Sequence, residues 1–165
     1  MLFFDGGALR YDGGPARTSD RLFTIGPRGA TIDASGGPVA LGAAGGSIAF
    51  SSSDNPASLI LTGAGAGALS AVLPDSGAGT NTTSLVKSGA GTWTLAATNT
   101  FTGNIAISGG TLYLNGANST SSITVVGGAT LGGSGSANSA TVTVAVAGTV
   151  EAGCGGSGSL TLAGL

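Results

Sequence analysis

Hydrophobic residues two positions apart recur along this chain, and the pairs return at nearly constant distances. One series runs Ile105/Ile107, Ile123/Val125, Val142/Val144 and Leu160/Leu162, with successive steps of 18, 19 and 18 positions. A second series interleaves with it through Trp93/Leu95, Leu112/Leu114, Leu131 and Val150, and its first members step by 19 positions each time. Alternation with a period of two is typical of short strands that bury one face. The spacing therefore predicts a repeat that contains two strands and returns every 18 or 19 positions.

Glycine-rich turns keep the same register as the strands, at Gly91, Gly110, Gly128 and Gly148. Such a repeat suits a coil that climbs one strand spacing, about 4.8 Å, per turn. Matching aliphatic residues would then stack from coil to coil. We predict an all-β chain folded as a right-handed parallel β-helix, a single domain over residues 1–165 with roughly eight or nine coils. An antiparallel sandwich is the alternative, because strands every 8–12 residues also suit one, but the near-constant step favours the solenoid.

The first half of the chain is less regular. Val39/Leu41 and Leu59/Leu61 lie 20 positions apart, Ile48/Phe50 and Leu69/Ala71 lie 21 apart, and Ile32 precedes Phe50 by 18. We expect these pairs to stack on one another, with short loop insertions explaining the uneven steps.

Composition narrows the function classes. The apolar fraction is 41% despite 33 glycines, which argues against a disordered linker. The net charge is −2, and the five basic residues form no basic stripe, so nucleic-acid binding is not expected. From Ser88 onward Glu151 is the only residue among Asp, Glu, Lys and Arg. Such a surface is more typical of a secreted, anchored or assembled protein than of a cytosolic one.

Candidate chemistry is sparse. The chain has no histidine, which excludes histidine-based triads and histidine zinc sites. We expect no enzyme activity, cofactor or metal. Glu151 should stack beside Gly132 and has no acidic neighbour. Asp54 and Asp75 lie in turn contexts. The segment 5–33 gathers most of the charges, which predicts an ion-paired edge; a calcium-dependent lyase cleft is the alternative. Its charged residues are Asp5, Asp12, Asp20, Asp33, Arg10, Arg17, Arg21 and Arg28.

A few residues are candidates for contacts with other molecules. Trp93 lies in an apolar column and is predicted to be core, whereas Tyr113 should point outward and could contact a glycan. Cys154 is the only cysteine, so it is either a small turn residue or the link of an interchain disulfide. Both ends are apolar, at Leu2 and Phe4 and at Leu160 and Leu162. Placing a second copy after the first puts Phe4 19 positions beyond Val150, which predicts head-to-tail filaments.

The middle of the chain resembles a known repeat. The matching positions are Lys87, Gly89, Gly91, Leu95, Asn99, Phe101, Gly103, Ile107, Gly110 and Leu112. Residues 87–114 are similar to the autotransporter-associated β-strand repeat, also called the passenger-associated transport repeat. The flanking segments agree with the family more loosely.

The resemblance implies a secreted or cell-surface protein of a Gram-negative-type bacterium. Passengers of this family fold as right-handed parallel β-helices and are exported through an outer-membrane β-barrel translocator. The repeat is thought to aid their folding and transport. The chain shows neither a signal sequence nor a barrel, so a fragment or repeat unit of a larger passenger is expected. We expect a structural stalk or passenger segment; the alternatives are a glycan-binding or host-surface adhesin module and, third, a polysaccharide lyase.

Overall fold

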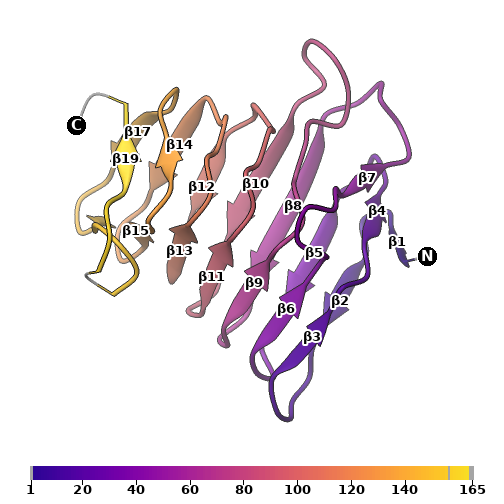
Figure 1. The fold of residues 1–165 in the computed structure, drawn as a ribbon, viewed down its shortest axis with the longest axis horizontal. Helices are drawn as coiled ribbons and strands as arrows, with labels where there is room; N and C mark the ends of the chain where they lie inside the picture. Colours follow the sequence, from indigo (N-terminus) through magenta and orange to yellow (C-terminus); the bar gives the residue numbers. More distant parts are fainter. Residues whose placement is uncertain (1, 156, 164–165) are drawn as a thin grey trace.

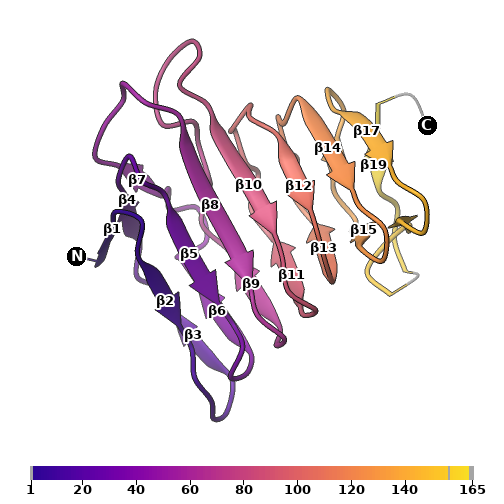
Figure 2. The same ribbon diagram turned by 180° about the vertical axis from the view of Figure 1, so that it is seen from behind.

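Two seven-stranded parallel sheets follow the long axis of the molecule (Figure 1, Figure 2). The computed structural model describes residues 2–155 and 157–163. The first sheet consists of β2 (Ala8–Arg10), β5 (Ala30–Asp33), β8 (Ala57–Thr62), β10 (Thr83–Lys87), β12 (Ile105–Ile107), β14 (Ser122–Val125) and β17 (Thr141–Val144). The second consists of β3 (Arg17–Ser19), β6 (Val39–Leu41), β9 (Gly67–Leu69), β11 (Thr92–Leu95), β13 (Thr111–Leu114), β15 (Thr130–Gly132) and β18 (Thr149–Val150).

A third face is built only near the two ends. At the N-terminal end it consists of β1 (Leu2–Phe4), β4 (Phe23–Ile25) and β7 (Ala49–Phe50), and at the C-terminal end of β16 (Ser136–Ala137) and β19 (Thr161–Leu162). Neighbouring strands within all of these sheets run parallel, which confirms the predicted parallel β-solenoid and rules out the antiparallel sandwich. The described residues contain no helix, hence none that could cross a membrane.

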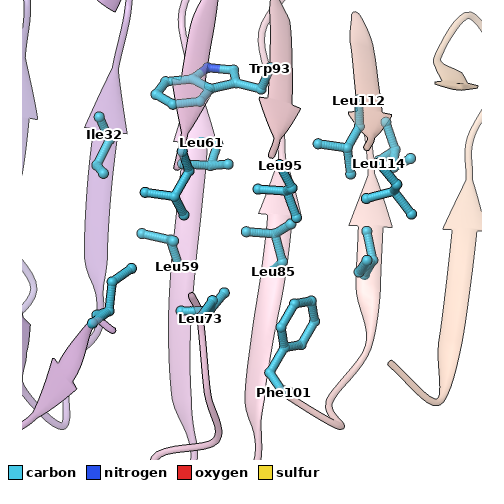
Figure 3. Close-up of a cluster of buried hydrophobic side chains, with 14 of the residues drawn as sticks. Ile32, Leu59, Leu61, Leu73, Leu85, Trp93, Leu95, Phe101, Leu112 and Leu114 are labelled. Carbon is cyan, nitrogen blue, oxygen red and sulfur yellow. The ribbon is translucent and has the colours of Figure 1, made fainter. Parts of the chain in front are cut away.

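The core lies between the sheets and is built from stacked aliphatic columns. Along β8 and β10, buried and partly exposed residues alternate, as the pleat of a strand requires. Leu59, Leu85 and Ile105 are in register in the first sheet and are all fully buried. Trp93 and Leu112 are likewise in register and fully buried in the second sheet. Figure 3 shows the side chains of Leu59, Leu85, Trp93 and Leu112 directed into one shared interior. Each large aliphatic side chain buried in this way contributes roughly 1.5–3 kcal/mol.

The predicted step of 18 or 19 positions is correct only in the C-terminal half. Ile105, Ile123 and Val142 stack in the first sheet at steps of 18 and 19. In the N-terminal half Thr31 pairs with Ile60 and Ile60 with Val86, at steps of 29 and 26. The average step is therefore about 22, and the chain makes about seven coils rather than eight or nine.

The predicted pairings in the first half are wrong because whole coils are longer there. Val39 and Leu41 stack on Gly67 and Leu69, not on Leu59 and Leu61. Leu59 and Leu61 stack instead on Ala30 and Ile32, so Ile32 does not pair with Phe50. Phe50 pairs with Ile25 on the third face, so the predicted stacking of Ile48/Phe50 on Leu69/Ala71 is also wrong. Extra residues leave the coil in loops before β8 and before β10, which project from the same corner of the molecule (Figure 1).

The predicted stacking of Leu160/Leu162 on Val142/Val144 is also wrong. Leu162 pairs with Ala137 on the third face, in the β16–β19 sheet. After β18 the chain follows the order of the preceding coil, in which β15 leads to β16 on the third face, and Gly153 forms an isolated antiparallel bridge with Gly133 on the way. The chain therefore reaches the third face before another strand can be added to β17.

Candidate functional site

The repeat-like segment forms two consecutive coils at the centre of the solenoid, from β10 to β13. Its apolar members Leu95, Phe101, Ile107 and Leu112 are all fully buried. The residues that carry the resemblance therefore build the stack and present little chemistry to solvent.

Lys87 is the least expected member of this group, because its side chain is fully buried. It ends β10 at an inward position, two residues after Leu85. Its Nζ donates hydrogen bonds to the carbonyl oxygens of Ser88 at 2.7 Å, Gly89 at 2.9 Å and Gly109 at 2.8 Å. All three ammonium hydrogens thus have acceptors, and Gly109 belongs to the next coil. Burial lowers the pKa of Lys87 to about 8. Lys87 therefore ties two successive turns together from inside.

Asn99 and Asn118 form a buried amide ladder at another corner of the same coils. Asn99 Oδ1 accepts from the Leu73 backbone N–H at 2.9 Å, and Asn99 Nδ2 donates to Asn118 Oδ1 at 2.9 Å. Asn118 Nδ2 donates in turn to the carbonyl oxygen of Gly116 at 2.8 Å. Because buried polar groups are costly when unpaired, this ladder fixes the register of three successive coils.

The motif glycines allow the turns to approach one another closely. Gly110 has φ of +62°, and a Cβ built on it would lie 2.3 Å from the carbonyl oxygen of Gly91. Both the backbone conformation and the space therefore demand glycine at this position.

Asp75 does more than form the predicted turn. Its Oδ1 accepts from the backbone N–H of Thr83 at 2.8 Å and of Thr102 at 2.9 Å. Its Oδ2 accepts from Thr102 Oγ1 at 2.7 Å. Asp75 therefore links the loop that precedes β10 to the coil after it.

The two projecting loops, residues 51–56 and 74–82, also brace each other. Asn81 Nδ2 donates to the carbonyl oxygen of Ser53 at 2.8 Å, and Ser76 Oγ donates to that of Asn55 at 2.7 Å. Ser76 is buried although it lies in a loop. The loops thus form one polar projection.

The outer face of the second sheet carries a column of mostly small residues, named here the outer column. Its members, in register from coil to coil, are Thr18, Ala40, Ala68, Thr94, Tyr113 and Gly132. A shallow hollow of about 270 Å³ lies over the small residues at its N-terminal end, with Arg17 and Pro38 also in its lining. Tyr113 follows Thr94 in the column, just beyond the hollow.

Tyr113 points outward between two buried leucines, as predicted, and lies across Gly132. A Cβ on Gly132 would lie 2.8 Å from the Tyr113 ring and 2.9 Å from Glu151 Cγ, so Glu151 does stand beside Gly132. Partial burial, followed by a hydrogen bond to Glu151 and its negative charge, raises the pKa of Tyr113. The Glu151 carboxylate is therefore turned back along the outer column.

The charged N-terminal segment forms exposed ion pairs. Arg10 lies 3.1 Å from Asp12 and 3.8 Å from Asp33, and Arg28 lies 3.1 Å from Asp5. This arrangement favours the predicted ion-paired edge. In the part of the chain that the structure describes, no three His, Cys, Asp or Glu side chains are grouped to hold a metal ion.

The predicted contact residues at the two ends lie on different faces. Phe4 is buried in β1 and packs edge-on against Phe23 at 5.4 Å, whereas Leu2 is exposed. The predicted stacking of Phe4 on Val150 of another copy is wrong in register, because Phe4 belongs to the third face and Val150 to the second sheet.

At the other end, Leu162 is buried and Leu160 is partly buried against the core. Cys154 is exposed in a turn, with its Sγ 3.1 Å from Asn115 Oδ1. An interchain disulfide through Cys154 stays a prediction.

Sequence reasoning missed the burial of Lys87 and the bridging by Asp75. The first had a readable signal, because the period of two that places Leu85 inward also places Lys87 inward. The second had none, since Asp75 reaches as far along the chain as Thr102. Among the described residues one buried side-chain oxygen, Thr83 Oγ1, has no hydrogen-bond partner.

Comparison with known proteins supports the resemblance found in the middle of the chain. Residues 85–114 match the family model of the passenger-associated-transport-repeat. The matched segment coincides with the two coils that contain Lys87, Asn99 and Gly110. Searches among curated proteins and among solved structures gave no match.

Proposed function

We propose that this chain is a non-catalytic structural segment of a secreted or surface-exposed passenger of the autotransporter type. One observation carries the proposal: the passenger-associated transport repeat lies at the centre of a parallel solenoid and supplies two of its coils. The motif side chains serve the stack, as the buried Lys87 and Asn99 illustrate. In a solenoid each coil contacts only its neighbours, so such a segment can act as a spacer of adjustable length.

The proposal is tested by following export. An epitope inserted in the projecting loop of residues 51–56, within the complete natural reading frame, should be detected on intact cells or in the medium and be cleaved there by added protease. Retention of the epitope inside cells, with the protein folded and stable, contradicts the proposal.

A matched pair of variants addresses the part played by the repeat. Gly110→Ala disrupts a close turn within the matched segment, whereas Gly79→Ala alters a glycine of similar φ, +67°, with open space around it. Export should fall for the first variant and stay near the native level for the second. Equal export of the two variants would show that the close turn of the repeat is not needed for export.

Head-to-tail assembly into filaments is the finer form of this proposal. Within the described residues, β2 and β3 at one end and β17 and β18 at the other each pair on one side alone, and such open edges recruit further strands. Arg17 is an argument against filaments, because its charged side chain would lie against the last coil of the preceding copy. Electron microscopy of concentrated protein distinguishes filaments from closed species.

A glycan-binding adhesin module is the second candidate function. The hollow in the outer column favours it, because Arg17, Thr18 and Thr94 line the hollow and Tyr113 follows Thr94 in register. A glycan array should then show binding that Tyr113→Ala abolishes and that Tyr11→Ala, a change at the chain's other tyrosine, leaves unchanged. Binding that is equal in both variants would contradict this role.

A further inference from the structure

Two segments of the chain match the acceptor sequence for N-linked sugars, Asn-x-Ser/Thr with no proline in the middle. The first is Asn81-Thr82-Thr83, which joins a projecting loop to β10, and the second is Asn118-Ser119-Thr120, which precedes β14. The sugar is carried by the asparagine amide, and the hydroxyl two positions later is the other group that the acceptor sequence specifies. The two segments differ in what the folded protein requires of these side chains.

The second segment is fully used by the fold. Asn118 is 5% exposed, and its Nδ2 donates to the carbonyl oxygens of Gly116 at 2.8 Å and Ser136 at 3.3 Å. Both amide hydrogens thus have acceptors. The buried Thr120 hydroxyl donates to the carbonyl oxygen of Gly103 at 2.6 Å. Hydrogen bonding within the solenoid therefore explains both side chains, and a sugar on Asn118 would displace part of the amide ladder.

The first segment leaves its threonine hydroxyl unexplained. Thr83 begins β10 at a fully buried position, and among the described residues its Oγ1 has no hydrogen-bond partner. A buried hydroxyl without a partner is costly, and valine would fill the same space without this cost. The folded state therefore gives no reason for a hydroxyl at this position, whereas the acceptor sequence does.

The asparagine of the first segment has room for a sugar. Asn81 is partly exposed in the loop of residues 74–82, which projects from the solenoid (Figure 1). Its Nδ2 donates one hydrogen bond, to the carbonyl oxygen of Ser53 at 2.8 Å. The second amide hydrogen has no acceptor among the described residues, so a sugar can replace it and keep the brace between the loops. Gly79, two residues earlier, has open space around it.

We propose that Asn81 is an N-glycosylation site, modified while the loop of residues 74–82 is open. In this reaction Asn81 Nδ2 forms a bond to C1 of a sugar whose leaving group is a diphosphate, carried by a nucleotide or a lipid. The bond between C1 and the phosphate oxygen breaks, the diphosphate leaves with the electron pair, and one Nδ2 proton passes to a base of the transferase. The assignment rests on the proposed function, because acceptor sequences on surface loops are glycosylated in secreted proteins.

The loop must open because the Thr83 hydroxyl is buried when the loop is closed. Thr83 is the first residue of β10, and its backbone N–H donates to Asp75 Oδ1 at 2.8 Å. Release of this contact exposes the acceptor sequence and leaves the stacked strands on either side in place. Exposure of Asn118 requires instead that the amide ladder across three coils be broken. Local opening therefore selects Asn81 over Asn118.

A sugar on the projecting loop also suits a surface with few charges. Only 7% of the residues of the chain are charged, and Lys87 is buried. Proteins with so little surface charge tend to associate, whereas a bulky sugar is solubilising. Glycosylation of Asn81 would therefore keep neighbouring solenoids apart at the corner where the loops protrude.

Mass spectrometry of the chain, produced in its natural host from the complete reading frame, tests the assignment. The peptide that carries Asn81 should be heavier by one or more monosaccharide residues, and the peptide that carries Asn118 should not. Asn81→Gln and Thr83→Val should both remove the added mass. Thr82→Val is the matched control, because it changes the middle position and leaves the acceptor sequence intact. Thr83→Ser should keep the sugar, since serine retains the hydroxyl.

Thr83→Val is expected to fold at least as well as the native chain, and thermal unfolding of the purified variants checks this. An unmodified Asn81 in the native chain, or a sugar that remains in Thr83→Val, overturns the assignment. A chain that is exported but unmodified would reject the sugar and leave the proposed function standing. A modified chain that stays inside the cell would reject the proposed function and leave the glycosylation site standing.

The need for an open loop is tested on the purified full chain from a host without a transferase. UDP-glucose serves as donor, with an N-glycosyltransferase that recognises Asn-x-Ser/Thr. Asp75→Ala should speed the modification of Asn81 by about tenfold or more, because the loss of hydrogen bonds to a carboxylate makes opening easier. Asp54→Ala is the control, since the side chain of Asp54 contacts only its own loop. Equal rates in the two variants overturn the requirement for opening.

Discussion

The two halves of this solenoid continue the same two sheets but differ in the length of chain that each coil uses. In the second sheet, the steps from Trp93 to Leu112, Leu131 and Val150 are 19 positions each. Before Trp93 the corresponding steps, from Arg17 to Val39 to Gly67 to Trp93, are 22, 28 and 26. Strand pairing and inward packing therefore determine how one coil stacks on the next. The number of residues in a coil does not.

The extra chain in the N-terminal half is itself organised. Residues 51–56 and 74–82 leave the coil at one corner, and Asn81 and Ser76 join them by hydrogen bonds to the carbonyl oxygens of Ser53 and Asn55. The long coils thus keep their register by bracing their insertions, whereas the short coils use the Asn99–Asn118 ladder and Lys87. The boundary between the long and the short coils, named here the seam, lies between β9 and β11, where Trp93 packs over Gly67.

The largest effect is expected at Trp93, on the seam itself. Its ring is fully buried over Gly67 of the long-coil half, and its Nε1 donates to the carbonyl oxygen of Thr62 at 2.9 Å. Trp93→Ala should lower the free energy of unfolding by about 3–5 kcal/mol in urea denaturation followed by circular dichroism.

The control for this prediction is Tyr113→Ala, an outward aromatic residue of the next coil. Its cost should be about 1 kcal/mol, near the centre of the distribution for point mutations, because the side chain is partly buried but outside the core. Equal losses in the two variants would show that the seam is not held by core packing.

The regular half could be predicted from the sequence, and the irregular half could not, for physical reasons. Ile105, Ile123 and Val142 stand at a near-constant spacing because turns between their strands are short. Val39 and Leu59 have almost the same apparent spacing, yet they lie in different sheets. A loop insertion moves a residue to another coil without changing local alternation, so the strands were recognisable and their pairing was not.

The candidate site divides in the same way. The outward direction of Tyr113 and the burial of Trp93 follow from alternation, and the structure has both. The loop-to-coil link made by Asp75 depends on an approach between distant segments that no local pattern records.

A second test compares glycines from the two halves. Gly110 in the short-coil half and Gly79 in the projecting loop have φ of +62° and +67°, but only Gly110 faces a close carbonyl oxygen. Gly79→Ala should cost about 1 kcal/mol from backbone strain alone. Gly110→Ala should cost about 2–3 kcal/mol more, because overpacking adds to the strain. Thermal unfolding of both variants measures the difference, and equal melting temperatures would contradict it.

A third test uses pH. Burial lowers the pKa of Lys87 from 10.5 to about 8, so between these values the unfolded chain binds the proton that the folded chain has lost. Stability should therefore rise with pH in this window, by at most about 1.4 kcal/mol per pH unit.

Lys87→Met and Lys87→Arg are the controls for the pH test. Methionine does not titrate and arginine stays charged, so neither variant should show the rise. Urea midpoints measured below, within and near the top of this window give the comparison. If the stability of the native protein changes with pH in parallel with that of both variants, the titration of Lys87 does not cause the rise.

The smallest effect is expected at Thr83, in the strand that precedes the seam. Its buried hydroxyl has no hydrogen-bond partner, whereas the Thr120 hydroxyl in the short-coil half donates to the Gly103 carbonyl oxygen at 2.6 Å. Thr83→Val should be neutral or stabilising by up to about 1 kcal/mol, and Thr120→Val should be destabilising by about 1–3 kcal/mol. The denaturant midpoints of the two variants should move in opposite directions or differ clearly. An equal loss of stability in both variants would contradict the difference in hydrogen bonding between the two hydroxyl groups.

Insertions at the corner from which residues 51–56 and 74–82 project lengthen the chain without adding a coil to the solenoid. The stacked columns depend on strand pairing and not on the number of residues in these loops, so related chains of unequal length can share one coil count. The same corner is a suitable site for inserting a foreign peptide, since the peptide would be displayed away from the interior and the solenoid would keep its strand register.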